Sequence, residues 1–349
     1  MVGRRNHLKN TMTINQTDLQ MKLDNAQEAE NSEDFFRAAF LYRDALTTAI
    51  KEGNSDVIKL CKNKSVEMNK KSIASGKDFK ELSFTQGLPN DKKKAHEEFI
   101  SKFLSQGDLK TILRAIGKHP FFFPKVVDVQ KSANKTMPIS YQIASLSTIS
   151  NDGHTLRGGS EGSYAWFMKM YDLNQQLIMT LYVGRIIYEL MENKPNGSKL
   201  TIDILLDYFN NSRIIEEGNL KIISVGLQKY FDRDYISALH ILVPQFESVF
   251  LKISERCGID IVALDQKQGI ATRTKTLSEY YLDSDEFKKV WGEDFCRQIK
   301  FILFEQLGYK IRHKIAHGEI TKEECNFQNT TLILYLYLVL LSRVNIKSE

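Results

Sequence analysis

The chain has 349 residues, which leaves room for two or three domains, each with a hydrophobic core of its own. Hydrophobic residues make up 42% of it and charged residues 26%, the proportions of an ordinary soluble globular protein. The net charge of +5 tolerates a polyanionic partner but is too small to predict one.

Local patterns argue against secreted and membrane-spanning classes. The four cysteines are widely spaced and form no Cys-x-x-Cys pair, so we expect no disulfide, no structural zinc and a reducing, cytoplasmic location. The N-terminal basic residues have no apolar stretch behind them, so we expect no signal peptide. The longest apolar run, Leu332 to Leu341, is too short to cross a bilayer and predicts a buried core helix and no membrane association.

Hydrophobic periodicity predicts an all-α protein, because no stretch shows sustained alternation of apolar and polar residues. The first region, residues 1–75, is expected to hold two or three amphipathic helices. Ser32-Glu33-Asp34 is a typical helix start, and the apolar residues that follow at helical spacing end near Gly53. The region is either a partner-binding helical module or plain helical packing, and no second copy supports a repeat array.

The second region, residues 76–196, is predicted to be mainly helical with loops. It begins with a polar linker at residues 76–100, which includes the charged run Asp91 to Lys94. Three consecutive phenylalanines, Phe121 to Phe123, are expected to fill a core, with a hydrophobic partner site as the alternative. The glycine-rich segment Asn151 to Ser163 lacks the Lys-Ser/Thr ending of a P-loop, so we expect a flexible loop or lid and no nucleotide triphosphate site.

The third region, residues 197–349, is predicted to be a compact helical bundle. A basic connector from Lys267 to Lys275 interrupts it, either as a solvated loop or as the lining of a cleft. The expected helices lie at 199–231 (two helices), 233–256, 291–307 with Gly308 as the cap, and about 321–344.

The most informative segment of the bundle is Arg312-His313-Lys314-Ile315-Ala316-His317, between two strongly apolar stretches. Arginine presents a planar, permanently charged fork that suits phosphate oxygens, and histidine exchanges a proton near neutral pH. These are the groups needed to cut RNA without a metal, because the 2′-hydroxyl must lose a proton while charge on the phosphate is neutralised. We assign phosphate binding to Arg312 and proton transfer to His317. His313 supplies a second polar contact or orients Arg312.

The spacing of the motif imposes a geometric condition. At about 100° per residue, Arg312 and His317 would lie about 140° apart on a regular α-helix. They cannot share one narrow helix face. The motif must therefore straddle a turn or helix end, or two copies must meet at a dimer interface, where a symmetric arrangement would gather two arginines and several histidines.

The long predicted helix at 233–256 offers supporting residues. His240 and Glu247 fall about 20° apart, along one border of its apolar arc, so we expect both to be half-buried. Pro244 lies between them and has no N–H to donate to the carbonyl of His240. Two interpretations remain open: the pair forms a wall of the site, or Glu247 pairs with a bundle arginine such as Arg312 and holds its guanidinium in place.

Metal chemistry is the rival interpretation of the two histidines. His313 and His317 have the i, i+4 spacing that suits a metal on a helix. The zinc-protease pattern requires glutamate directly after the first histidine, and Lys314 stands there instead. We therefore expect no metal and no cofactor.

Residues Arg312 to Gly318, at the end of an α-helical bundle, resemble the signature of the HEPN superfamily, which is Arg, a polar residue, three or more residues and then His. The segment Leu239 to Glu247 resembles the helix that precedes the motif in an uncharacterised bacterial branch with the pattern Arg-Asn-x-x-x-His-Gly. The resemblance covers residues 200 to 345. The usual asparagine is His313 here. The tyrosine of toxins paired with nucleotidyltransferase antitoxins is Glu319, which disfavours that subtype.

The resemblance implies a metal-independent endoribonuclease that is active as a homodimer, with Arg312, His313 and His317 as its motif. Such proteins serve as toxins or abortive-infection effectors in antiviral defence, and several cut tRNA. The first 196 residues would then sense a trigger, bind a regulatory protein partner or restrain activity. Because many members of the superfamily are inert scaffolds, the alternative is a non-enzymatic helical adaptor that dimerises through the bundle.

Overall fold

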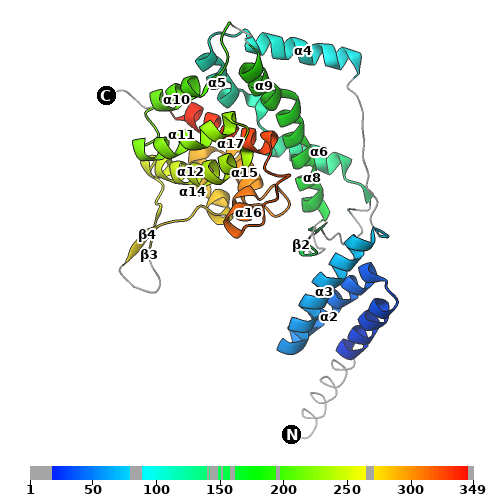
Figure 1. Ribbon diagram of the computed structural model, residues 1–349. Coiled ribbons are helices and arrows are strands. Elements are labelled where there is room, and N and C mark those ends of the chain that lie inside the picture. The colour runs from blue at the N-terminus through cyan, green and yellow to red at the C-terminus, as the bar shows by residue number, and fades with distance from the viewer. Residues whose placement is uncertain are drawn as a thin grey trace. The chain divides into compact units, whose positions relative to one another are not determined.

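The structure is a computed structural model, and it describes residues 18–78, 89–139, 141, 148–150, 152–157, 162–193, 197–264 and 271–344. The prediction of an all-α protein is confirmed, since helices make up most of the described chain (Figure 1). The strands described are those of two short antiparallel hairpins, β1 (Thr148–Ile149) with β2 (Thr155–Arg157) and β3 (Val262–Leu264) with β4 (Thr272–Thr274).

The chain divides into two compact units in place of the three expected regions. Unit 1 comprises residues 1–86 and 144–162, and unit 2 comprises residues 87–143 and 163–349. The expected boundary at 75/76 lies near the end of the first segment of unit 1, whereas no boundary between units falls at 196/197. The reason is packing: helices from the expected middle region lie against the last helix of the chain within unit 2.

Unit 1 is built around a helical hairpin, α2 (Phe35–Glu52) and α3 (Ser55–Ser75), preceded by helical residues 18–31. The predicted start and end of its first long helix are confirmed, because the Asp34 side chain caps α2 and Gly53 ends it. The inserted β1–β2 hairpin belongs to this unit: Asn69 of α3 donates a hydrogen bond to the carbonyl of Gly153. The interhelical core consists largely of alanines, with Tyr42 among them.

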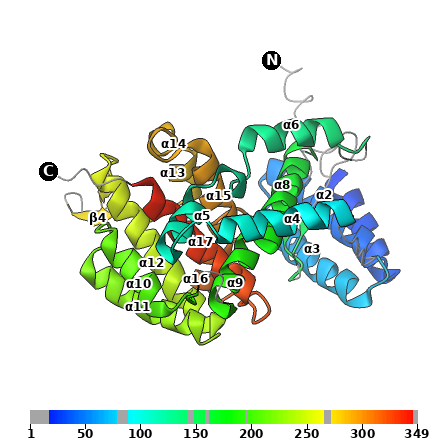
Figure 2. The same cartoon turned by 90° about the horizontal axis from the view of Figure 1, so that it is seen from above.

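Unit 2 is organised around α17 (Phe327–Arg343), whose residues from Leu332 to Leu341 are all buried, as the sequence predicts. Helices α5 (Leu109–Lys118), α9 (Gly184–Glu192) and α12 (Tyr235–Arg256) pack on it, and α11 (Glu217–Phe231) packs on α12 (Figure 2). Two buried tyrosines of α17 donate hydrogen bonds to main-chain carbonyls: Tyr335 to Phe122, and Tyr337 to Leu242.

The remaining elements of unit 2 cover this centre. They are α4 (Asn90–Leu104), the 3₁₀ turn Pro120–Phe122, α6 (Val126–Thr136), α8 (Gly162–Leu177) with the π-helical turn Ile178–Val183, α10 (Ile202–Asn211), α13 (Glu279–Asp283), α14 (Asp285–Trp291), α15 (Glu293–Leu303) and α16 (Ile311–His317).

Several predicted boundaries are wrong, for local reasons. The polar linker at 76–100 is in part α4, which begins at Asn90. Its lysines are exposed while Ile100 and Phe103 are buried, so the charged run is the outer face of an amphipathic helix. The helix expected at 291–307 is α15, which ends at Leu303, and the last helix starts only at Phe327, where Asn326 caps it.

The aromatic, glycine-rich and basic segments differ from expectation in parts. Phe122 and Phe123 are buried in the core as predicted, but Phe121 is 48% exposed. The described part of the glycine-rich segment forms the β1–β2 turn and the start of α8, and residues 151 and 158–161 lie outside the described residues. The described part of the basic connector is strand β4, with residues 265–270 outside them.

Within the described residues, α12 alone is long and apolar enough to cross a membrane by length and composition. Half of its most apolar stretch is buried inside unit 2. It packs against α11 and α17.

Candidate functional site

The predicted motif forms the short helix α16, which has seven residues from Ile311 to His317. Its first residue, Ile311, is buried in the core and anchors the helix. Gly308 makes the preceding turn feasible: a Cβ atom there would lie 2.2 Å from the carbonyl oxygen of Phe301 in α15. The next residue, Tyr309, donates its main-chain N–H to that same oxygen. Glycine therefore lets the chain turn tightly off α15 and enter the motif.

Arg312 and His317 lie on the same helix, as its second and last residues. At about 100° per residue their side chains point about 140° apart around the helix axis. One copy of the chain therefore does not direct both groups to a single helix face. The helix ends directly after His317, where Gly318 caps it with a left-handed conformation.

Arg312 forms an ion pair with Glu247. This pairing is one of the two interpretations of Glu247 that the sequence leaves open. Its Nε donates to Oε2 of Glu247 over 3.0 Å, and Oε1 of the same carboxylate accepts the N–H of Leu277 over 2.9 Å. The guanidinium also lies 5.8 Å from the centre of the Phe304 ring. Among the described residues, the two Nη groups of Arg312 have no hydrogen-bond partner, so the outer edge of the fork is free for an anion.

Glu247 thus joins three segments of unit 2: α12, the stretch before α13 and α16. Its side chain is only 14% exposed, and that of Arg312 is 26% exposed. A charge pair this sheltered from water orients its partners more firmly than a surface pair does. The position of Glu247 at the half-buried border of α12 agrees with the prediction.

His240 does not share that border, and this part of the prediction is wrong. The residue is exposed, and its ring Nδ1 lies 2.8 Å from the carbonyl of Ile236, one turn back in α12. Ile236 itself is 47% exposed, so no described element covers this edge of the helix. The helix continues through Pro244 to Arg256.

His313 and His317 lie side by side, with ring centroids 4.2 Å apart. His313 is half-buried, and its burial lowers its pKa below the ordinary 6.5, with smaller contributions from Lys310 and His317. His313 is therefore neutral at pH 7, where a neutral imidazole can accept a proton. His317, at the end of the helix, is exposed to solvent.

Among the residues that the structure describes, the pair of histidines has no third metal ligand beside it. No group of three His, Cys, Asp or Glu side chains that could hold a metal ion occurs in the described part of the chain. Protein zinc sites supply at least three ligands, so the donor set seen here falls short of one.

Two ion pairs hold the segment after the motif against α16, and no sequence pattern predicts them. Lys314 forms an ion pair with Glu324, and Lys310 lies 3.5 Å from Glu319. A cavity of about 250 Å³ lies beside these groups, with Tyr309 in its lining. Lysines and glutamates at such spacings are ordinary surface residues, so only the folded chain reveals that they close on α16.

Replacing Glu247 by glutamine tests its hold on Arg312. The amide still accepts the N–H of Leu277 but no longer carries the charge that pairs with the guanidinium. We expect a loss of about 1–2 kcal/mol in the free energy of unfolding, measured by chemical denaturation. The matched control is Glu217→Gln, because Glu217 pairs with Lys221 on the open surface, where both side chains are more than 70% exposed. Equal free energies of unfolding for the two variants would show that the Glu247–Arg312 pair stabilises the fold no more than a surface ion pair does.

The stability of unit 2 is expected to fall with pH through the titration of His313. Because its pKa is lowered in the folded state, the unfolded chain binds the proton more readily, and stability drops as the pH falls below about 6.5. His313→Gln should lack this component. From pH 7 to pH 5, the Tm of the wild type should therefore fall further than the Tm of the variant.

In NMR titrations, His317→Ala should raise the pKa of His313, because His317 contributes to lowering it. An unchanged pKa of His313 would contradict the coupling between the two histidines.

Comparison with known proteins returned no relative: no protein-family model, curated protein or solved structure matches this chain.

Proposed function

We propose that the protein is a metal-independent endoribonuclease of the HEPN kind, which cleaves RNA by attack of the 2′-hydroxyl on the adjacent phosphate. The observation that carries the proposal is the content of α16: an arginine fixed by Glu247 with its outer fork free, and two adjacent histidines, one of them exposed. The reaction requires a group that stabilises charge on the phosphate and groups that transfer protons, and α16 carries both kinds.

In the proposed reaction, the 2′-oxygen forms a bond to phosphorus as its proton passes to an imidazole. The bond from phosphorus to the 5′-oxygen breaks, and that oxygen takes a proton from a second imidazole. The products are a 2′,3′-cyclic phosphate and a 5′-hydroxyl end, so atoms and charge balance without a metal. Arg312 binds the non-bridging phosphate oxygens through its Nη groups, His317 transfers the proton, and His313 assists as a neutral neighbour.

The proposal requires a homodimer, because a single α16 directs Arg312 and His317 about 140° apart. A two-fold axis near α16 would let the arginine of one copy meet the histidine of the other. An exposed edge of α12 supports such an interface. Ile236, His240 and Pro244 follow each other at four-residue spacing toward Glu247, and all three are exposed.

The biological role proposed with this activity is that of a cytoplasmic toxin or abortive-infection effector, with tRNA as a candidate substrate. Unit 1 would bind a regulatory protein partner. Exposed apolar side chains on its helices, among them Phe40 and Ile50, are available for such a contact.

A second candidate function is that of a non-enzymatic adaptor that dimerises through unit 2. The specific observation in its favour is the Glu247 ion pair, because a purely structural arginine would be held in the same way. Cleavage activity decides between the two.

The test is incubation of the purified full-length protein with total RNA and with tRNA in the presence of EDTA. The nuclease predicts fragments that end in a 2′,3′-cyclic phosphate, a dimer in light scattering, and growth arrest on expression. Intact RNA under all conditions, or cleavage only with an added metal, would overturn the proposed mechanism. An inert protein that still dimerises would favour the adaptor.

A further inference from the structure

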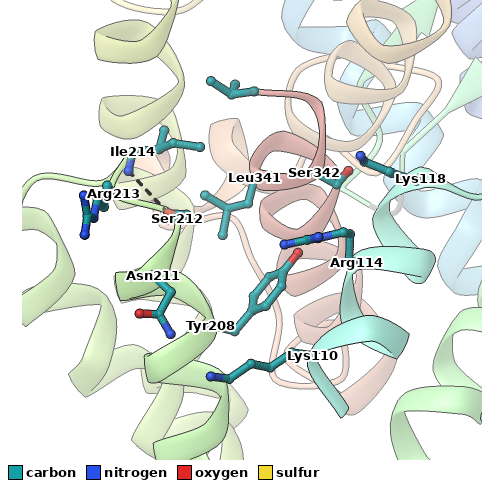
Figure 3. A pocket seen from close by; sticks show the side chains of 11 residues that line it. Lys110, Arg114, Lys118, Tyr208, Asn211, Ser212, Arg213, Ile214, Leu341 and Ser342 are labelled. Atoms are coloured by element: carbon teal, nitrogen blue, oxygen red, sulfur yellow. Dashed lines mark hydrogen bonds between the residues drawn. The ribbon is translucent and has the colours of Figure 1, made fainter. Parts of the chain in front are cut away.

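A cleft lined by basic side chains opens between α5, α10 and the C-terminal end of α17 (Figure 3). Its volume is about 420 Å³, which is within the range of roughly 300–1,000 Å³ for pockets that bind small molecules. All of its lining belongs to unit 2. The motif helix α16 is not part of it.

One wall of the cleft is the polar face of α5. Lys110, Arg114 and Lys118 follow each other at four-residue spacing, about 6 Å apart along the axis, while the opposite face of the helix is buried. Figure 3 shows Arg114 reaching into the cleft beside the hydroxyl of Tyr208, and Lys118 beside Ser342.

The positive charge of this wall is only partly balanced. Lys110 pairs with Asp207 of α10. Among the described residues, neither Arg114 nor Lys118 lies within ion-pair distance of an acidic group, although both line the same cavity. Two neighbouring cations that open onto one concave space are suited to a doubly charged anion such as a phosphate ester.

The other wall is mixed. Ile214, in the turn after α10, Leu341, near the end of α17, and Val344 present apolar edges to the cleft. The polar residues Asn211, Ser212 and Arg213 lie beside them. A free inorganic ion would leave these apolar edges uncovered. A ligand that fills the whole cleft therefore has an anionic end and an apolar body.

We propose that the cleft binds a small phosphorylated molecule with an apolar or aromatic body. Its phosphate lies between Arg114 and Lys118, and its body lies against Ile214 and Leu341. A long polyanion such as RNA suits the cleft less well, because Asp207 places a negative charge at its Lys110 end.

The site is separate from the proposed nuclease centre. The segment after α16 leads into the start of α17, whereas Leu341 and Ser342 lie at its other end. The 17 residues of α17 span about 25 Å. Binding at the cleft can thus be tested whether or not the protein cleaves RNA.

The experiment is calorimetric titration of the full-length protein with 1-naphthyl phosphate, which carries both halves of the expected ligand. The comparison probes are 1-naphthol, which lacks the anion, inorganic phosphate, which lacks the body, and a short single-stranded RNA. We expect 1-naphthyl phosphate to bind at least about tenfold more tightly than either small comparison probe.

Arg114→Gln and Lys118→Gln should each weaken binding of 1-naphthyl phosphate by about tenfold or more. Lys94→Gln is the matched control, because Lys94 is an exposed lysine of α4 outside the cleft. Lys118→Gln still decides the question if Arg114→Gln fails to fold. Three results would overturn the proposal: no binding of 1-naphthyl phosphate, equal binding by the cleft variants, or a preference for RNA that the same variants abolish.

Discussion

Replacing His317 by alanine is expected to reduce RNA cleavage by roughly 10²–10⁴-fold, the usual contribution of one general acid or base. The residue is exposed at the end of α16, so its removal should leave the fold intact, with an unchanged Tm. The matched control is His154→Ala, because His154 is an exposed histidine of unit 1. Comparable cleavage by the His317 variant and the control would remove His317 from the mechanism.

Substitutions of Arg312 test the phosphate-binding half of the proposed site in the same cleavage assay. Arg312→Ala should also abolish cleavage, and Arg312→Lys should not restore it, because an ammonium group cannot fork onto two phosphate oxygens. If Arg312 of one copy meets His317 of the other across a two-fold axis, half of the dimers in an equimolar mixture of Arg312→Ala and His317→Ala would be mixed. Each mixed dimer would keep one of its two Arg312–His317 pairs, so the mixture should regain roughly a quarter of wild-type activity. Two inactive variants that stay inactive when mixed would contradict a site shared between copies.

Replacing Gly117 by alanine is expected to destabilise unit 2 by about 1–3 kcal/mol. Gly117 lies where α5 crosses α17, and an added Cβ atom would stand 2.2 Å from the carbonyl oxygen of Leu338. The obstacle is main chain, so the two helices must move apart to relieve it. This loss exceeds the gain of up to about 1 kcal/mol that alanine normally brings to a helix. Chemical denaturation monitored by circular dichroism measures the change.

The control for Gly117 is a second helical glycine. A Cβ atom at Gly218 in α11 would meet nothing within 4 Å. Gly218→Ala should therefore leave stability unchanged or raise it by up to about 1 kcal/mol. If both variants shift the denaturation midpoint in the same direction, the close crossing of α5 and α17 is not the cause.

Much of the helical architecture follows from local signals in the sequence. Capping residues place the ends of α2, because Asp34 accepts an N–H of its first turn and Gly53 adopts a left-handed conformation after its last. Apolar periodicity likewise predicts α12 closely. The two hairpins escape the same analysis because strands of two or three residues are too short to show alternation.

The site could be predicted only in part, since its contacts depend on which elements cover which. The sequence places Glu247 and His240 on the same border of α12. In the structure, one is sheltered by the Leu277 segment and α16, and the other is open to solvent. Glu247 and Arg312 are 65 positions apart in the chain. No spacing rule spans that separation, so the ion pair was one of two open interpretations.

The basic cleft had no signal at all before the fold was known. Lys110, Arg114 and Lys118 look like the solvated face of any amphipathic helix. What makes them different is the opposite wall of the cleft, whose residues come from α10, from the turn after it and from the end of α17. The cleft forms only when folding brings these distant segments of the chain next to the basic face of α5.

The interleaved course of the backbone limits how this protein can be dissected. Because residues 144–162 belong to unit 1, cutting the chain at one position cannot give a fragment that contains all of one unit and none of the other. A fragment that begins at residue 87 would keep Gly153 and Thr155 but lose Asn69 and Arg43, their hydrogen-bonding partners. Genetic separation of the halves therefore calls for removal of residues 1–86 together with an internal excision of residues 144–162.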